Sequence, residues 1–508
     1  MKPFRPFFAL IFLLAVAGLF LLVAYAAEKF PVIRDEVGVR LPLISNLVEE
    51  VCPSEAFQEN SEVPDTAIAF TTDTVFVEPK DSAFQQDLTD SIQCLSKDSI
   101  VVDSTITQSV ANFEYVDSLE NPLSVFFEAL KSLKSNGGKV RVLHYGDSQI
   151  EGDRFTTDIR NTLQNQFGGF GVGVQPVVPY SYLPAGFSQW SSDGWEYSSL
   201  IDANTDVERI GFFGGVSSVG GDLWAEKVQV KRRGGIRNSK YTRLRLIYGY
   251  SENNVDLVKI VDGIAVDTIT LSAYWGVEER FLSVPLSAKK VELRFVGSGT
   301  FKILGLSMES ANGVFVDNIP LRGSSGLVFS GFDRLLFRRI TEWLNVKLVI
   351  VQFGVNLVPG NLKSYKYYEK QLYRQLVALK AVQPKMSIVV IGVSDMSERI
   401  NGNYVSYPSV EKVRDAQRNA ALRAGVAFWD TYKVMGGKNS MPQWVFAKPS
   451  LATKDFVHFN FRGAKKVAKM FTDALMLEYS NFKQQKIIKA DTVSVDSVES
   501  TIYSREHE

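Results

Sequence analysis

The stretch HYGDSQIEGD, residues 144–153, places Ser148 behind Gly146 and Asp147 at the end of an apolar run. A serine hydroxyl attacks an ester when a base accepts its proton and a third group orients the base. The stretch alone leaves two interpretations open, a catalytic nucleophile or a polar residue that closes a turn. The choice depends on whether partners for a nucleophile occur elsewhere in the chain.

The candidate bases are few, because the chain has three histidines. His507 lies in a polar C-terminal stretch, and His144 lies on the apolar run four residues before Ser148, so we interpret His144 as structural. His458 remains, and Asp455 precedes it by three residues. That spacing puts both side chains on one face of a tight loop or first helical turn. We therefore predict that Asp455 orients His458 and that the other ring nitrogen faces Ser148.

Acyl transfer also needs hydrogen-bond donors for the oxyanion. The amide of Ser148 is one candidate. Asn356 follows Gly354 just beyond the apolar run VKLVIVQFG, so its side-chain amide would reach the same edge of a sheet as Ser148. The third candidate is the amide of Gly323, where glycine lets the backbone approach a substrate closely.

These pieces, in this order, resemble the sequence blocks of the SGNH or GDSL-type hydrolases. The resemblance spans about residues 145–460 and implies a flavodoxin-like sheet, a serine nucleophile and a three-donor oxyanion hole. Pro320 departs from the second block, where a further glycine is usual, and this makes Gly323 the least secure match. The matching blocks are Gly146-Asp147-Ser148, Gly323, Gly354-x-Asn356 and Asp455-x-x-His458.

Within that family, the chain most resembles extracytoplasmic carbohydrate O-acetylesterases, notably those that act on peptidoglycan. The segments HYGDSQIEGDR, FGGFGVG and FWDTYKVMGGKNSMPQW are similar to that group, some of whose members carry a β-sandwich between the first and second blocks. The resemblance implies a serine esterase that removes O-acetyl groups from a cell-wall or extracellular glycan.

The elements that must position these residues are those of an α/β domain in two segments, 111–185 and 311–480. Apolar residues at helical spacing predict helices in PLSVFFEALKSL, from Phe155 to Phe167 and over about 461–479. Near-continuous apolar runs such as VKLVIVQFG and MSIVVIGVSD predict parallel strands buried on both faces. In open parallel sheets, sites form at the carboxyl ends of the strands, where Ser148 is predicted to lie.

Residues 186–310 instead alternate with period two, which predicts an inserted antiparallel β-sandwich that is carbohydrate-binding-like. Asp262-Gly263 is a hairpin signal. Trp190, Trp195, Trp224 and Trp275 fall in this segment. An exposed tryptophan there would stack on sugar rings, whereas a buried one would fill the core, and we expect the core for most.

The ends of the chain have a different character. Residues 1–27 read as a transmembrane anchor because Phe7 to Ala27 carry no charge, and cleavage as a signal peptide is the alternative. Lys2 and Arg5 precede the run, so we expect an inner-membrane anchor with the catalytic domain in the periplasm. Residues 28–110 read as a partly disordered polar spacer and 481–508 as a polar tail. Cys52 and Cys94 lie in the spacer, and whether they pair stays open.

Composition excludes some partners. Lys+Arg and Asp+Glu both number 56 in 508 residues, so nothing in the overall charge indicates nucleic acid. The scattered histidines and distant cysteines supply no zinc ligand set, and the glycine-rich stretches lack a phosphate-loop or full dinucleotide motif. We therefore predict neither a metal nor a cofactor.

Three other functions stay open at this stage. The same Ser-His-Asp set would serve an O-acetyltransferase acting on a polysaccharide, with a membrane acyltransferase as partner. A lipase would need an apolar cleft. A catalytically inactive glycan-binding envelope protein is the non-enzyme alternative, and the presence of Ser148, Asp455 and His458 together favours an enzyme.

Overall fold

The computed structural model describes residues 112–116, 120–179, 186–201, 209–233 and 239–503, with side chains up to residue 485. The predicted anchor (1–27) and spacer (28–110), with Cys52 and Cys94, lie outside the described residues. Within the described ranges, no helix combines the length and the apolar character that crossing a bilayer requires.

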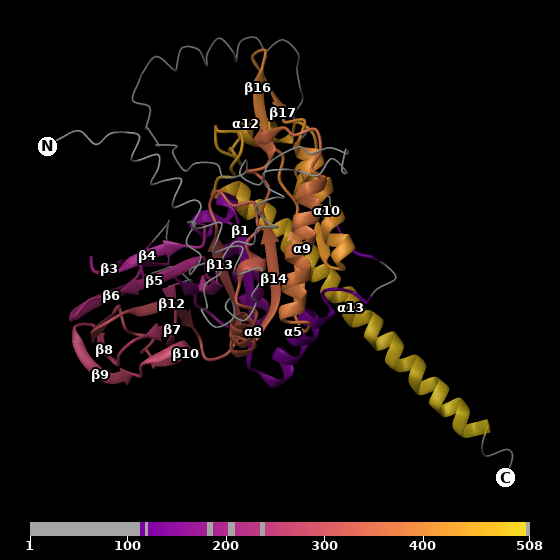
Figure 1. The fold of residues 1–508 in the computed structure, drawn as a ribbon. Coiled ribbons are helices and arrows are strands. Elements are labelled where there is room, and N and C mark those ends of the chain that lie inside the picture. The colour runs from indigo at the N-terminus through magenta and orange to yellow at the C-terminus, as the bar shows by residue number, and fades with distance from the viewer. Residues whose placement is uncertain (1–111, 117–119, 180–185, 202–208, 234–238, 504–508) are drawn as a thin grey trace, which may run out of the picture. The chain divides into compact units, whose positions relative to one another are not determined.

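A five-stranded parallel sheet forms the centre of the α/β part (Figure 1). Its spatial order is β13-β1-β14-β15-β18, and every neighbouring pair is parallel. In chain order this is 2-1-3-4-5, the order of flavodoxin-like sheets, so the predicted α/β class is confirmed. The strands are β1 (Lys139–Gly146), β13 (Gly313–Pro320), β14 (Val346–Gln352), β15 (Ser387–Ile391) and β18 (Ala427–Trp429).

Helices cover both faces of this sheet and make three layers. The first face packs in one apolar cluster with α5 (Ser124–Asn136), α6 (Thr156–Phe167) and α13 (Phe461–Tyr503). On the second face, α8 contacts β14, and α10 contacts β15 and β18. The helices of that face are α8 (Arg334–Trp343), α9 (Lys366–Val382) and α10 (Val410–Ala424).

The helical periods of the sequence explain this packing. Phe155, Ile159, Leu163 and Phe167 all lie in the core, and Gly168 ends α6 with a φ of 81°. The predicted last helix, about 461–479, was too short, because α13 continues to Tyr503 through the expected polar tail. No glycine or proline follows Gly463, so nothing in the backbone stops the helix.

Two antiparallel sheets make the sandwich and enclose a second apolar cluster. One sheet has the order β10-β7-β12-β5-β4 with β2 paired to β12, and the other has the order β3-β6-β11-β8-β9. The three-residue β2 lies in the segment predicted for the hydrolase domain, and it was too short to show a period. The strands are β2 (Gly173–Gln175), β3 (Phe187–Ser191), β4 (Glu196–Ser199), β5 (Gly215–Val219), β6 (Trp224–Arg232), β7 (Arg243–Ser251), β8 (Val255–Val261), β9 (Ile264–Leu271), β10 (Tyr274–Ser283), β11 (Lys290–Gly297) and β12 (Phe301–Glu309).

The hairpin signal in this segment is confirmed, whereas the expectation that most of its four tryptophans lie in the core is wrong, because two of them are exposed. Asp262 and Gly263 both have positive φ, 49° and 93°, in the turn between β8 and β9. Trp195 and Trp224 lie in the sandwich core, whereas Trp190 and Trp275 are exposed.

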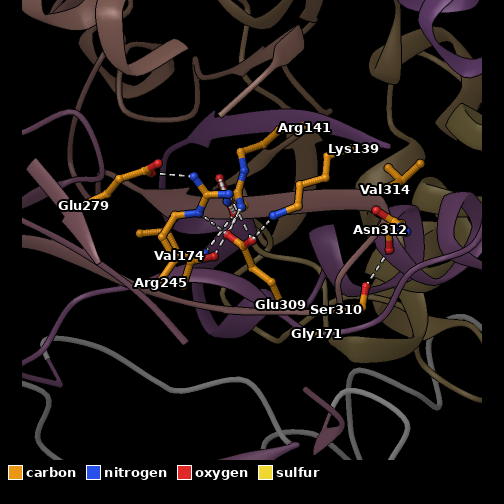
Figure 2. A network of polar contacts seen from close by, with 12 residues as sticks. Lys139, Arg141, Gly171, Val174, Arg245, Glu279, Glu309, Ser310, Asn312 and Val314 are labelled. Atoms are coloured by element: carbon orange, nitrogen blue, oxygen red, sulfur yellow. Dashed lines mark hydrogen bonds and ion pairs between the residues drawn. The ribbon is translucent and has the colours of Figure 1, made fainter. Parts of the chain in front are cut away.

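Buried charges join the sandwich to the parallel sheet (Figure 2). Glu309 of β12 accepts hydrogen bonds from Arg141 of β1, Lys139 and Arg245 of β7. Arg141 also donates to both carboxylate oxygens of Asp317 on β13, at 2.7 and 2.8 Å. The side chains of Arg141, Glu309 and Asp317 are almost completely buried. We call these five residues the charge network.

The α/β part also contains a small hairpin and two short helices. The hairpin consists of β16 (Ser397–Ile400) and β17 (Asn403–Ser406), and β17 contacts α12 (Ser440–Phe446), which follows α11 (Thr431–Met435). Figure 1 shows the hairpin beside α12. Short 3₁₀ turns span Ser148–Asp153, Phe329–Gly331 and Val358–Gly360.

Candidate active site

The loops that carry the predicted site residues leave adjacent strands at the same edge of the parallel sheet. Ser148 follows β1, Gly323 follows β13 and Asn356 follows β14. Because β13, β1 and β14 are neighbours and parallel, their carboxyl ends meet there. Three residues far apart in sequence are brought to one place by topology alone.

Ser148, His458 and Asp455 form a continuous hydrogen-bonded chain. The Oγ atom of Ser148 lies 2.7 Å from Nε2 of His458, and Nδ1 of His458 lies 2.8 Å from Oδ2 of Asp455. Both distances are those of good hydrogen bonds. With Nδ1 protonated and bonded to the carboxylate, Nε2 is free to accept the serine proton.

Asp455 is held in its charged form by its own loop. Burial opposes ionisation, but hydrogen bonds from His458, Thr453 and two backbone amides outweigh it and keep the pKa of Asp455 well below its usual range. Oδ1 accepts from the amides of Val457 and His458 at 2.9 and 3.0 Å, and from the hydroxyl of Thr453 at 2.6 Å. Oδ2 is therefore left for the imidazole, and the carboxylate stays ionised at neutral pH.

The three predicted oxyanion donors lie on the loops that leave the sheet at the edge where Ser148 lies. In the part of the chain that the structure describes, the amides of Ser148 and Gly323 have no hydrogen-bond acceptor. Asn356 donates one of its two side-chain protons to the carbonyl of Ser324 at 3.0 Å, which fixes the amide and leaves the second proton available. This set has the donor types that an oxyanion requires.

Glycine at position 323 has a conformational reason. The amide of Ser324 donates to the carbonyl of Leu321 at 3.0 Å, which closes a turn in which Gly323 has a φ of 82°. A side chain added at Gly323 would contact nothing within 4 Å, so backbone conformation and not space selects glycine. Pro320, which departs from the family pattern, is the last residue of β13, and the turn forms after it.

Asp147 ties the serine loop to the asparagine loop. Its Oδ1 accepts from the amide of Gln149 at 3.0 Å, and its Oδ2 accepts from the amide of Val355 at 3.4 Å. Burial raises the pKa of Asp147 to about 6, although these amides and the nearby His458 lower it. Asp147 thus bonds the residue after Ser148 and the residue before Asn356, and so holds the loops of these two proposed oxyanion donors together.

Gln149 is a residue that sequence reasoning missed. Its Nε2 donates to the carbonyl of Val457 at 2.7 Å, and its Oε1 accepts from the amide of Phe459 at 3.2 Å. The side-chain amide therefore holds the backbone on both sides of His458. Gln149 directly follows Ser148, and this adjacency was the only signal that pointed to it.

The β16–β17 hairpin supports the histidine loop from another side. The amide of Ser397 donates to the carbonyl of Phe456 at 3.0 Å. The ring of Tyr404 stacks on that of Phe456, with centroids 3.6 Å apart and an interplanar angle of 13°. Phe456 lies between Asp455 and His458 in sequence, so the hairpin packs directly against the loop that carries them.

His144 does not join the chain of Ser148 and His458. It is completely buried, with Nε2 3.0 Å from Gln352 and Nδ1 2.9 Å from Thr156. Burial lowers the pKa of His144 to about 3, so the ring is neutral at physiological pH. Its role is structural, as its position on the strand predicted.

Comparisons with known proteins identify the fold. No family model and no curated protein matches the sequence. Among solved structures, a peptidoglycan O-acetylesterase matches with a TM-score of 0.59 and 21% sequence identity, covering 73% of this chain and 99% of that one. This chain shares that fold. The neighbour is consistent with the predicted resemblance, and the fold that the resemblance implied is confirmed.

Two further solved structures match less of the chain. A family two carbohydrate esterase from Cellvibrio japonicus has 10% identity and a TM-score of 0.23, covering 58% of this chain and 99% of that one. A salicylyl-acyltransferase from a tetracycline biosynthetic pathway has 14% identity and a TM-score of 0.27, covering 60% and 97%.

Proposed function

We propose that this protein is a serine esterase that removes O-acetyl groups from a cell-envelope glycan. The observation that carries the proposal is the hydrogen-bonded chain Ser148–His458–Asp455 beside two unoccupied amides and the amide of Asn356. The shared fold with a solved peptidoglycan O-acetylesterase supports the substrate class.

In the first half-reaction, Ser148 Oγ attacks the acetyl carbonyl carbon while His458 Nε2 takes the hydroxyl proton. The carbonyl oxygen becomes an oxyanion and accepts hydrogen bonds from the amides of Ser148 and Gly323 and from Asn356. Asp455 stabilises the imidazolium. The tetrahedral intermediate then expels the sugar oxygen, which takes the proton from His458 Nε2, and leaves an acetyl ester on Ser148.

In the second half-reaction, water replaces the sugar. His458 takes a proton from the water, the resulting hydroxide attacks the acetyl-serine, and collapse returns the proton to Ser148 Oγ and releases acetate. If a second sugar hydroxyl attacked instead of water, the same residues would perform acetyl transfer. The acceptor therefore separates the esterase from the transferase.

The test is acetate release from 4-nitrophenyl acetate and from O-acetylated muropeptides, with residues 28–508 of the wild type and of Ser148→Ala. We expect the wild type to release acetate without any added acceptor. The variant should lose several orders of magnitude in kcat with an unchanged fold by circular dichroism. Equal rates for the two proteins would disprove Ser148 as the nucleophile. Transfer of the acetyl group to an added sugar acceptor, with no release of acetate, would replace the esterase by the transferase.

A further inference from the structure

Three aromatic rings lie together beside the loop that carries Asp455 and His458. The ring of Phe456 packs against Tyr404 of β17 and against Phe446 at the end of α12, with centroids 3.6 and 5.7 Å apart. Tyr404 and Phe446 are 6.4 Å apart. We call these three residues the aromatic platform. Its members come from three separate segments, so the fold assembles it.

The platform is open to solvent on one side. Phe456 is buried, but Phe446 is 62% exposed and Tyr404 is partly exposed. Arg399 pairs with Tyr404 across the hairpin and shares its face, and it is exposed too. An exposed aromatic ring beside a second, partly exposed one offers flat surfaces on which the face of a ligand ring can pack. The exposed ring of Phe446 adds little to the core and is therefore available to a ligand.

The proposed chemistry decides which part of the substrate would lie there. The acyl oxygen must face the donors at Ser148, Gly323 and Asn356. His458 must return its proton to the leaving oxygen, so the alcohol half of the ester lies on the His458 side of Ser148. Phe456 is two residues from His458 along the chain, so the Cα atoms of the two residues are at most roughly 8 Å apart. The platform is thus anchored on the loop that carries the proposed proton donor to the leaving alcohol.

The surface also has the chemistry that a sugar requires. A pyranose ring presents C–H groups on its faces and hydroxyls at its edge, so its face packs on an aromatic ring while its edge needs polar partners. The exposed guanidinium of Arg399 lies 5.9 Å from the ring centroid of Tyr404. It offers donors beside the ring surface to hydroxyl or carboxylate groups.

We propose that the aromatic platform is a subsite for the sugar that carries the scissile acetyl group or for the sugar next to it. This inference rests on the proposed esterase function, because the leaving-group side is defined by Ser148 and His458. It explains why a hairpin and a short helix without any triad residue pack on the histidine loop.

The first experiment compares Phe446→Ala with the wild type on O-acetylated muropeptides and on 4-nitrophenyl acetate. We expect the ratio of kcat/KM for the muropeptide to kcat/KM for the small ester to fall about 3- to 10-fold, mainly through the muropeptide KM. Leu335→Ala is the control, because Leu335 is 82% exposed on α8 and lies outside the site. It should leave the ratio unchanged. An equal loss on both substrates, or no loss on either, would overturn the proposal.

A binding measurement separates failure of the subsite from failure of the esterase function. Calorimetric titration of muropeptides into Ser148→Ala and into Ser148→Ala/Phe446→Ala needs no turnover. Weaker binding by the double variant, about 3- to 10-fold in Kd, supports the subsite even if the wild type hydrolyses no ester. Equal affinities would reject the subsite even if the esterase activity is found.

Discussion

Ser148 and Gln149 are neighbours in the chain that act on different parts of the same histidine. Ser148 contacts the imidazole of His458, while Gln149 bonds the backbone on either side of that residue. A proton moves between serine and histidine only when the two atoms are well placed. The proposed nucleophile and the alignment of its base are thus encoded by two consecutive residues.

Replacing Gln149 by Ala is expected to lower kcat about 10- to 100-fold on both test esters, because the histidine loop loses two hydrogen bonds. The carbonyl of Val457 and the amide of Phe459 would be left without these partners, which should also reduce the free energy of unfolding by about 1–3 kcal/mol. Gln164→Ala is the matched control. Gln164 is equally buried and donates to the carbonyls of Gly171 and Val314, away from the triad. It should lose similar stability in urea unfolding without the loss of rate. Parallel losses of rate in both variants would show that Gln149 has no specific role.

At the scale of elements, local patterns predicted what is locally determined. The parallel strands, α6 with its four-residue spacing and the Asp262-Gly263 turn all follow from short stretches of sequence. The order of the motifs along the chain predicted that Ser148, Asp455 and His458 would lie together. Gln149 and the stack of Tyr404 on Phe456 escaped prediction, because each depends on a contact between segments distant in the chain and has no period of its own.

The turn at Gly323 gives a prediction at this scale. Gly323→Ala is expected to reduce the free energy of unfolding by about 1 kcal/mol, because alanine must adopt positive φ while its methyl group meets no neighbour. Relaxation of the turn moves the amide, so kcat should fall by up to about 100-fold. Gly263→Ala carries the same strain at a φ of 93° in a sandwich hairpin, also without a clash. Gly263→Ala should lose about the same stability in thermal unfolding but keep its full rate of ester hydrolysis. A Gly323→Ala enzyme that loses stability but keeps full kcat would contradict the predicted dependence of the rate on this turn.

At the scale of the whole molecule, the charge network makes the sandwich and the parallel sheet interdependent (Figure 2). Burial favours the neutral form of Glu309, but Arg141, Arg245 and Lys139 prevail and lower its pKa to about 2. A carboxyl with a lowered pKa in the folded state stabilises the fold above its unfolded pKa, near 4.5. That contribution is lost as the pH falls from about 4.5 towards 2.

Glu309→Gln should therefore lower the free energy of unfolding at pH 7 by about 3–5 kcal/mol, since it leaves buried cations without their shared anion. The difference from the wild type should shrink as the pH falls below about 4.5, where the wild type loses the same stabilisation. Glu279→Gln is the control, because Glu279 is more exposed and bonds Arg245 alone. Urea unfolding at pH 7 and pH 3.5 measures both. A difference that stays constant with pH would contradict the charged state of Glu309.

The path of the chain into and out of the sandwich has a consequence for protein engineering. Strand β2 leaves and β12 returns as an antiparallel pair, and a methyl group on Gly313 would lie 2.3 Å from the Cα atom of Gly169. A backbone spliced from Gly169 to Gly313 would thus need no linker, so the sandwich is a removable cassette by connectivity. The charge network opposes its removal, because Arg141 would lose its ion pair with Glu309. A minimal catalytic domain should therefore keep Arg141, which still neutralises the buried carboxylate of Asp317 on β13.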